Sequence, residues 1–92
     1  MIQFLVHNRK DNVGVATVDI KAGDTVSGLT LDTNEKISIR ALEDIPLGHK
    51  IALRMLRQGA TALKYGHDIG RVVKLVKAGR LVHVHNLKTK RW

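Results

Sequence analysis

Apolar residues in this chain fall in short runs separated by polar turns that are rich in glycine, asparagine and aspartate. Runs of this length, with β-branched residues and partial alternation, are typical of strands. Four such strands are predicted in the first half of the chain, at residues 2–7, 13–18, 25–31 and 36–41. The last two flank the turn formers 32–35 and predict a hairpin. Gly14 predicts a bulge or a close backbone approach.

One spacing recurs four times along the chain. An apolar residue is followed by two turn residues and a glycine, and three residues later by another apolar or small residue. The four copies are Ile20–Gly23 with Val26, Ile45–Gly48 with Ile51, Leu56–Gly59 with Ala62, and Val76–Gly79 with Val82. Glycine adopts positive φ without steric cost, so each copy predicts a sharp corner that leads into a new strand.

Four corners in 92 residues predict a mainly β fold of short strands that cross one another repeatedly. Two stretches, residues 51–56 and 71–76, also carry apolar residues at three- and four-residue spacing. That spacing favours one or two brief helices within the otherwise all-β domain.

The C-terminal stretch Arg80–Trp92 carries the clearest candidate chemistry. Its apolar residues predict a strand, on which His83 and His85 would point the same way, about 6.6 Å apart. Two imidazoles on one face can bind a metal or orient a carboxylate. A metal would need further ligands, from another chain if this one lacks them. The same spacing also fits two surface histidines without a chemical role.

Two other segments hold candidate residues. His49 and Lys50 follow the Gly48 corner, where a loop tip exposes charge and backbone N–H groups to a ligand. The segment Lys64–Gly70 contains the titratable pair His67 and Asp68, which could supply an acid or a base, and Tyr65, which could supply a phenol hydrogen bond. Ordinary turns account for both segments equally well.

Charge is distributed unevenly. Residues 1–46 carry five basic and seven acidic side chains, whereas residues 47–92 carry eleven basic side chains and one acid, Asp68. This asymmetry predicts an anionic partner or substrate. The basic half has only Tyr65 and Trp92 as aromatics and no nucleic-acid-binding motif, which argues against nucleic acid.

Length and composition predict one domain, residues 1–92, with no linker. The chain has no cysteine, no secretory signal pattern and no apolar run of membrane-spanning length, so we expect a cytoplasmic protein without a transmembrane segment. No nucleophile elbow, P-loop, dinucleotide-binding glycine set or paired carboxylates occur. The chain is therefore not expected to complete a catalytic cycle alone.

Four ordered motifs give the chain a family resemblance. They are His7-Asn8…Asp11-Asn12-Val13-Gly14-Val15-Ala16, Asp44-Ile45-Pro46-Leu47-Gly48-His49-Lys50-Ile51-Ala52-Leu53, Lys64-Tyr65-Gly66…Ile69-Gly70 and Gly79…Val82-His83-Val84-His85-Asn86-Leu87. Together they resemble the amino-terminal SAF-type domain of altronate and galactarate dehydratases. The resemblance implies a compact β-clip fold.

The resemblance also implies a partner. In that family a much larger catalytic region binds a divalent metal, typically iron. Because this chain stops at Trp92, we expect that region to be a separate large subunit that holds most of the metal site. Residues 86–92 are similar to the small subunit of a two-chain member that eliminates sulfite from (2R)-sulfolactate. Other members eliminate water from a sugar acid, and both reactions are β-eliminations from a 2-hydroxy carboxylate.

Roles for individual residues follow from the resemblance as hypotheses. His83, His85, His49 and Lys50 are the candidate catalytic residues, with His83 and His85 also possible metal ligands. The candidate substrate-binding residues are Asn86, Lys64, Tyr65, Lys88 and Arg91. A higher oligomer of the two-chain complex remains compatible with the sequence. So do a purely structural assembly subunit and a carbohydrate- or nucleic-acid-binding module.

Overall fold

Nine short strands make up the fold seen in this computed structural model, which describes residues 1–64, 67–83 and 86–88, with the backbone alone at residues 64, 67 and 68. The strands are β1 Phe4–Val6, β2 Val13–Ala16, β3 Thr25–Thr30, β4 Lys36–Arg40, β5 Lys50–Ala52, β6 Thr61–Lys64, β7 His67–Val72, β8 Leu81–Val82 and β9 Leu87–Lys88. The described residues contain no helix, so the all-β prediction is confirmed. None of them forms a helix that could cross a membrane.

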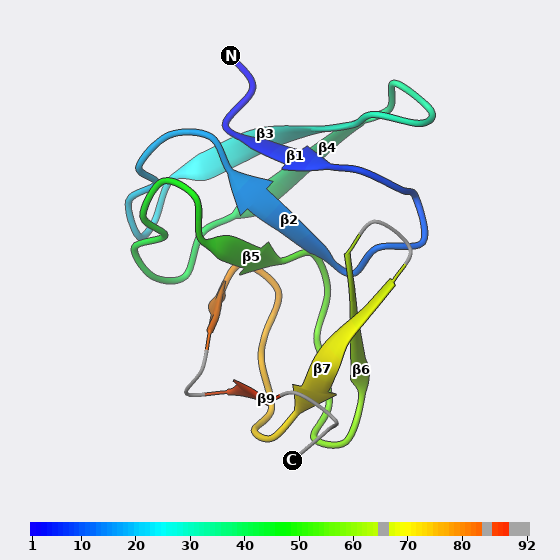
Figure 1. The fold of residues 1–92 in the computed structure, drawn as a ribbon. Coiled ribbons are helices and arrows are strands. Elements are labelled where there is room, and N and C mark those ends of the chain that lie inside the picture. Colours follow the sequence, from blue (N-terminus) through cyan, green and yellow to red (C-terminus); the bar gives the residue numbers. More distant parts are fainter. Residues whose placement is uncertain (65–66, 84–85, 89–92) are drawn as a thin grey trace.

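Two sheets form the molecule (Figure 1). The larger has the order β4-β3-β1-β2-β5-β8, and the smaller has the order β6-β7-β9. Among the strand pairs of the described residues, β1–β3 is parallel and the others are antiparallel. The hairpin predicted around residues 32–35 is confirmed as β3 and β4. In Figure 1 the smaller sheet lies below β2 and β5.

Asn12 fastens the smaller sheet to the larger one. Its side-chain Nδ2 donates to the carbonyl of Thr61 at 2.9 Å, and its Oδ1 accepts from the N–H of Leu63 at 2.7 Å. Its own carbonyl accepts from Leu53 N–H at 3.0 Å. The side chain of Asn12, directly before β2, is thus hydrogen-bonded to two residues of β6, Thr61 and Leu63.

Each region has its own apolar cluster. The first packs Phe4, Val6, Ala16, Ile20, Val26, Ala41, Ile45 and Ile51. The second packs Val13, Ala52, Leu56, Val72, Val76 and Val82. The ring of Phe4 lies against Gly14 and Gly28, where any added Cβ would press on or overlap the ring. The predicted close approach at Gly14 is therefore confirmed, with the Phe4 side chain and the Leu5 carbonyl as the neighbours.

The four predicted corners are confirmed. Ile20, Ile45, Leu56 and Val76 are all buried, and the glycine that ends each corner has φ between 85° and 91°. The residues three positions further on are buried as well, in β3, β5, β6 and β8.

The corners come in two pairs that cross each other. Ile20 and Ile45 exchange two backbone hydrogen bonds of 2.9 Å, and Leu56 and Val76 exchange bonds of 2.7 and 2.8 Å. We call these the first crossing (residues 19–23 and 44–48) and the second crossing (residues 55–59 and 75–79).

The two brief helices predicted at residues 51–56 and 71–76 are wrong. Ala52 and Leu56 are four residues apart, as are Val72 and Val76, and all four side chains are buried in the second cluster. In each case the first residue ends a strand and the second anchors a corner of the second crossing. A strand followed by a corner therefore reproduces the four-residue spacing of a helix.

Candidate active-site histidine pair

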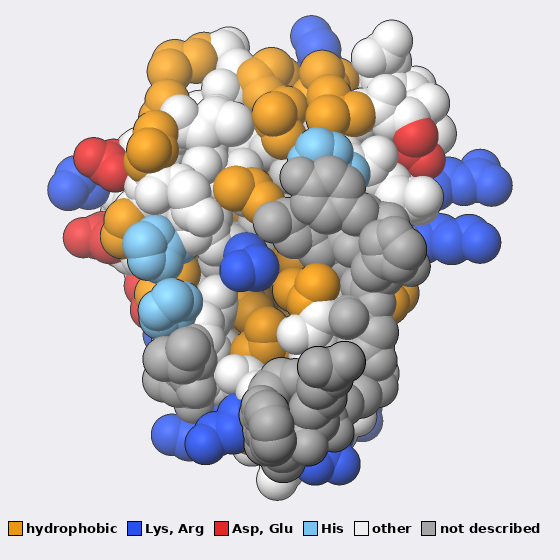
Figure 2. Space-filling view, in the orientation of Figure 1, with side chains coloured by type: hydrophobic (Ala, Val, Ile, Leu, Met, Phe, Trp, Pro, Cys, Tyr) orange, Lys and Arg blue, Asp and Glu red, His pale blue; other side chains and the backbone are white. Residues whose placement is uncertain are grey.

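His49 and His83 lie together on the surface. Their ring centroids are 5.1 Å apart with the planes tilted by 53°, and two histidine side chains are seen against each other in Figure 2. The contact arises because β5 and β8 are antiparallel with Lys50 opposite Val82, so the residues just beyond these positions, His49 and His83, also meet. Two segments that the sequence suggested separately thus form one site.

The first crossing holds His49. Its carbonyl accepts from Ala16 N–H at 2.9 Å, and its N–H donates to the carbonyl of Pro46 at 3.0 Å. The ring Nδ1 lies 3.4 Å from the carbonyl of Leu47. The position of this imidazole is therefore fixed by the Gly48 corner and by β2.

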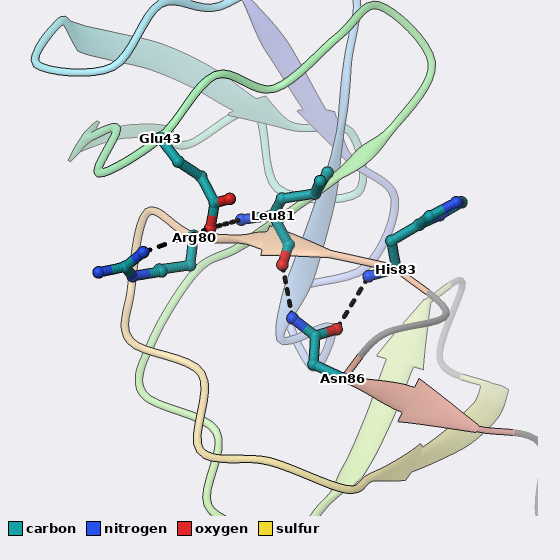
Figure 3. Close-up of polar contacts among 5 residues, drawn as sticks. All are labelled: Glu43, Arg80, Leu81, His83 and Asn86. Carbon is teal, nitrogen blue, oxygen red and sulfur yellow. Dashed lines mark hydrogen bonds and ion pairs between the residues drawn. The ribbon is translucent and has the colours of Figure 1, made fainter.

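Asn86 holds His83 (Figure 3). Its Oδ1 accepts from His83 N–H at 2.9 Å, and its Nδ2 donates to the carbonyl of Leu81 at 2.7 Å. The backbone N–H groups of Asn86 and Leu87 both donate to the carbonyl of His83, at 3.0 and 2.9 Å. The side chain of Asn86 is only 5% exposed.

The strand predicted to begin at Leu81 does not continue through His83. The chain leaves β8 at Val82, bends at His83, turns at Asn86 and re-enters a strand at Leu87, in the other sheet. The physical reason is Asn86, whose short amide satisfies backbone groups that a sheet ladder would otherwise pair. The expected same-face alignment of His83 and His85 stays a prediction, because His85 lies outside the described residues.

Glu43 fixes the other end of β8. Its Oε2 accepts from Leu81 N–H at 3.1 Å and lies 3.8 Å from Arg80 Nη1 (Figure 3). Sequence reasoning missed this residue, because nothing local connects a carboxylate after β4 with a strand that begins 38 positions later. Its position beside a buried corner, one residue before Asp44, was the only available signal.

The other candidate residues are more scattered. Lys50 is half-buried at the start of β5, between Val15 and Val82 on the neighbouring strands. Lys88 is exposed in β9, opposite Arg71 in the smaller sheet. The backbone of Lys64 ends β6, and Tyr65 and Arg91 lie outside the described residues. The structure therefore joins only His49 and His83 directly, with Asn86 positioning His83.

This pair can carry out proton transfer. A neutral imidazole accepts a proton and an imidazolium donates one, so two adjacent rings are of a chemical type that can act as base and acid. As metal ligands they would supply two nitrogen atoms. Among the residues that the structure describes, no group of three or more His, Cys, Asp or Glu side chains is placed to hold a metal ion.

Comparison with known proteins agrees with this architecture. The family model of the altronate/galactarate dehydratase SAF domain matches residues 2–90. The chain belongs to this family. The SAF domain predicted from the ordered motifs is therefore confirmed.

Relatives of two lengths share this SAF domain. The (2R)-sulfolactate sulfo-lyase subunit alpha of Chromohalobacter salexigens is 45% identical over 99% of this chain and 98% of its own length. The subunit of the same name from Paracoccus pantotrophus is 49% identical over 64% of this chain and 88% of its own. The altronate dehydratase of Bacillus subtilis is 35% identical over 97% of this chain, but the match covers only 17% of that enzyme.

Replacing Asn86 by leucine is expected to destabilise this SAF domain by about 1–3 kcal/mol, because the part-buried N–H of His83 and carbonyl of Leu81 lose their hydrogen-bond partners. Thermal unfolding followed by circular dichroism measures the loss. Asn86→Asp is the comparison variant: it keeps the acceptor for His83 N–H, but it replaces the donor to the Leu81 carbonyl by a charged acceptor. A leucine variant as stable as the parent would contradict the positioning role of Asn86.

Proposed function

We propose that this chain is the small (alpha) subunit of a two-chain lyase that eliminates sulfite from (2R)-sulfolactate to give pyruvate. The observation that carries the proposal is the degree of similarity to the two sulfo-lyase alpha subunits. The identity to those subunits is 45% and 49%, whereas the identity to the two altronate dehydratases is 35% and 38%. The word subunit in the relative's name supports a separate partner chain.

The reaction needs groups that this chain can offer. A base removes the C2 proton, and the electron pair of that bond forms the C2–C3 double bond. The C3–S electron pair leaves with sulfite. The resulting enol gains a proton at C3 and loses its C2 hydroxyl proton, which gives pyruvate. We assign the proton transfers to the His49–His83 pair, which is exposed enough to meet a substrate brought by a second chain.

Charge supports an anionic substrate. The half of the chain that contains the histidine pair carries eleven basic side chains and one acid. A basic surface of this kind raises the local concentration of a dianion such as sulfolactate. Within it, Lys50 lies next to His49 in the chain and is the cation that we assign to the substrate carboxylate or sulfonate. Lys64, Tyr65, Lys88 and Arg91 stay predictions for substrate binding, as does His85 for catalysis.

The metal is assigned mainly to the large subunit. His49 and His83 provide two nitrogen donors, which fits a contribution to a metal site but is fewer than the three or more protein ligands that such sites commonly use. A divalent metal, with iron as the family expectation, would stabilise negative charge on the substrate when bound.

Two alternatives are favoured by specific observations. Identities of 35% and 38% to altronate dehydratases support a hydro-lyase small subunit that releases water from a sugar acid. Lys88 lies in the smaller sheet and the histidine pair adjoins the larger one, and this separation supports an assembly subunit that touches no substrate.

Co-expression with the large chain of the same lyase tests the proposal. We expect a complex that copurifies and releases equal amounts of pyruvate and sulfite from (2R)-sulfolactate, with neither chain active alone. If the complex acts on altronate or galactarate but not on sulfolactate, its substrate is a sugar acid and the alternative hydro-lyase function is correct. Full activity of the large chain alone would leave this chain as an assembly subunit, and the proposal would be wrong.

A further inference from the structure

The two crossings have the same backbone geometry. In the first, Gly23 N–H donates to the carbonyl of Ala41 and Gly48 N–H to that of Ala16, both at 2.8 Å. In the second, Gly59 N–H donates to Val72 at 2.7 Å and Gly79 N–H to Ala52 at 2.9 Å. Each glycine thus bonds the residue four positions before the opposite corner's anchor. The outward-facing side chains of the two crossings can therefore be compared position by position.

In the first crossing, side chains of each corner accept hydrogen bonds from backbone N–H groups of the opposite corner. Asp19 lies just before Ile20, and its Oδ1 accepts from Leu47 N–H in the opposite corner at 2.9 Å. Asp44 lies just before Ile45, and its Oδ1 accepts from Ala22 N–H at 2.8 Å. Both carboxylates are thus used to cap the opposite corner.

The second crossing has apolar side chains at these two positions. They are Met55, 49% exposed, and Leu75, 55% exposed. The amides equivalent to those of Ala22 and Leu47 are the N–H groups of Gln58 and Ala78. Among the described residues, no side-chain acceptor bonds either of them.

Cations alternate with these apolar side chains. Because Leu56 and Val76 pair antiparallel, Met55 lies opposite Lys77, and Leu75 lies opposite Arg57. All four are exposed, with a net charge of +2. The corresponding residues of the first crossing are Asp19, Lys21, Asp44 and Pro46, with a net charge of −1.

A pocket of about 320 Å³ opens beside Leu75. Among the described lining residues, the cations are Lys74, Lys77 and Arg80, and the one carboxylate, Glu43, pairs with Arg80. Asn86, the residue that holds His83, also lines it. The pocket is therefore basic, partly apolar and connected through one side chain to the histidine pair.

We propose that the outward face of the second crossing, together with this pocket, is the docking surface for an acidic segment of the large subunit. This inference rests on the proposed function, which supplies that partner. Apolar side chains of the segment would cover Met55 and Leu75, and its carboxylates would meet Lys74, Lys77 and the open N–H groups. Desolvated apolar contacts framed by complementary charge are the usual composition of a specific interface.

The charge and the apolar side chains of this face favour an acidic protein segment over a second copy of the chain and over a nucleic acid. A second copy of the chain, with a net charge of +8, would bring like charges together at this face. A nucleic acid would leave Met55 and Leu75 without apolar partners. An acidic, partly apolar protein segment matches both properties.

The test uses Lys77→Glu and Leu75→Glu, with Lys21→Glu as the matched control. Lys21 directly follows the anchor Ile20 of the first crossing, as Lys77 directly follows the anchor Val76 of the second, and both lysines are exposed. Isothermal titration calorimetry measures the Kd for the purified large subunit. We expect each second-crossing variant to raise Kd about tenfold or more and Lys21→Glu to change it by less than about twofold. Added salt is expected to weaken parent binding more than binding of Lys77→Glu.

The outcomes separate this inference from the proposed function. If the parent chain forms an active complex but all three variants bind equally well, the docking surface is wrong and the function stands. If the parent neither binds the large chain nor supports elimination, both are wrong. If sedimentation shows that the parent chain alone dimerises and Lys77→Glu abolishes the dimer, the surface belongs to a second copy. Unchanged thermal unfolding of each variant shows that its fold is intact.

Discussion

Replacing His83 by alanine is expected to lower kcat of the assembled lyase about 10²–10⁴-fold, the usual contribution of a positioned acid or base. The side chain of His83 is exposed and meets His49 at 5.1 Å, so its removal takes away one of the two adjacent imidazoles while leaving the buried core untouched. Steady-state release of pyruvate and sulfite measures the loss.

Three controls assign the cause. His83→Gln keeps a hydrogen-bonding side chain but does not titrate, so it is expected to stay inactive if His83 transfers a proton and to recover activity if it only holds a hydrogen bond. The Kd for the large subunit and the thermal stability are expected to stay within error. Combining His83→Ala with His49→Ala is expected to cost little more than either change alone, because residues that act as a unit are not additive. Full activity of both single variants would make the pair structural.

The largest stability loss is expected from Gly79→Ala, at about 3 kcal/mol or more. Gly79 has φ of 89°, and a Cβ there would overlap the carbonyl oxygen of Arg40. The backbone would have to move, which would strain the hydrogen bonds from Gly79 N–H to Ala52 and from Leu42 N–H to Gly79, of 2.9 and 3.0 Å. For a domain of this size the melting temperature is expected to fall by more than about 12 °C.

Gly23→Ala is the matched control for this variant. Gly23 ends the equivalent corner with φ of 91°, and a Cβ there would meet no atom within 4 Å. We therefore expect a loss of about 1–2 kcal/mol, from the backbone conformation alone. The difference between the two variants, measured by thermal or urea unfolding, isolates the contact with Arg40. Equal losses would show that the contact relaxes without cost.

The relation between the crossings and the histidine site gives these experiments a common structural basis. Gly79 directly precedes Arg80 and Leu81, which Glu43 holds in place. Leu81 and His83 are in turn joined by the amide of Asn86. A substitution that displaces the backbone of the second crossing is thus expected to shift the position of His83 through these contacts. A substitution that displaces the first crossing is expected to shift the position of His49.

The sequence by itself determined the local features of the fold. The four corners need only an apolar anchor, two turn residues and a glycine, and their positive φ values follow from those residues. The β3–β4 hairpin likewise follows from alternation and turn formers that are close in the chain. Family membership was also accessible, because it depends on ordered motifs and not on contacts.

Only the tertiary structure decided which of these features meet. Nothing local indicates that the corner at Ile20 pairs with that at Ile45, or that β5 pairs with β8 and so joins His49 to His83. Local spacing was misleading at Ala52–Leu56, where a strand and a corner imitated a helix. It was misleading again directly after Val82, where the apolar pattern predicts a continuing strand but His83 lies in a bend and its N–H donates to the amide of Asn86. Long-range pairing depends on which surfaces bury each other, and the energy of that burial is not contained in any single segment.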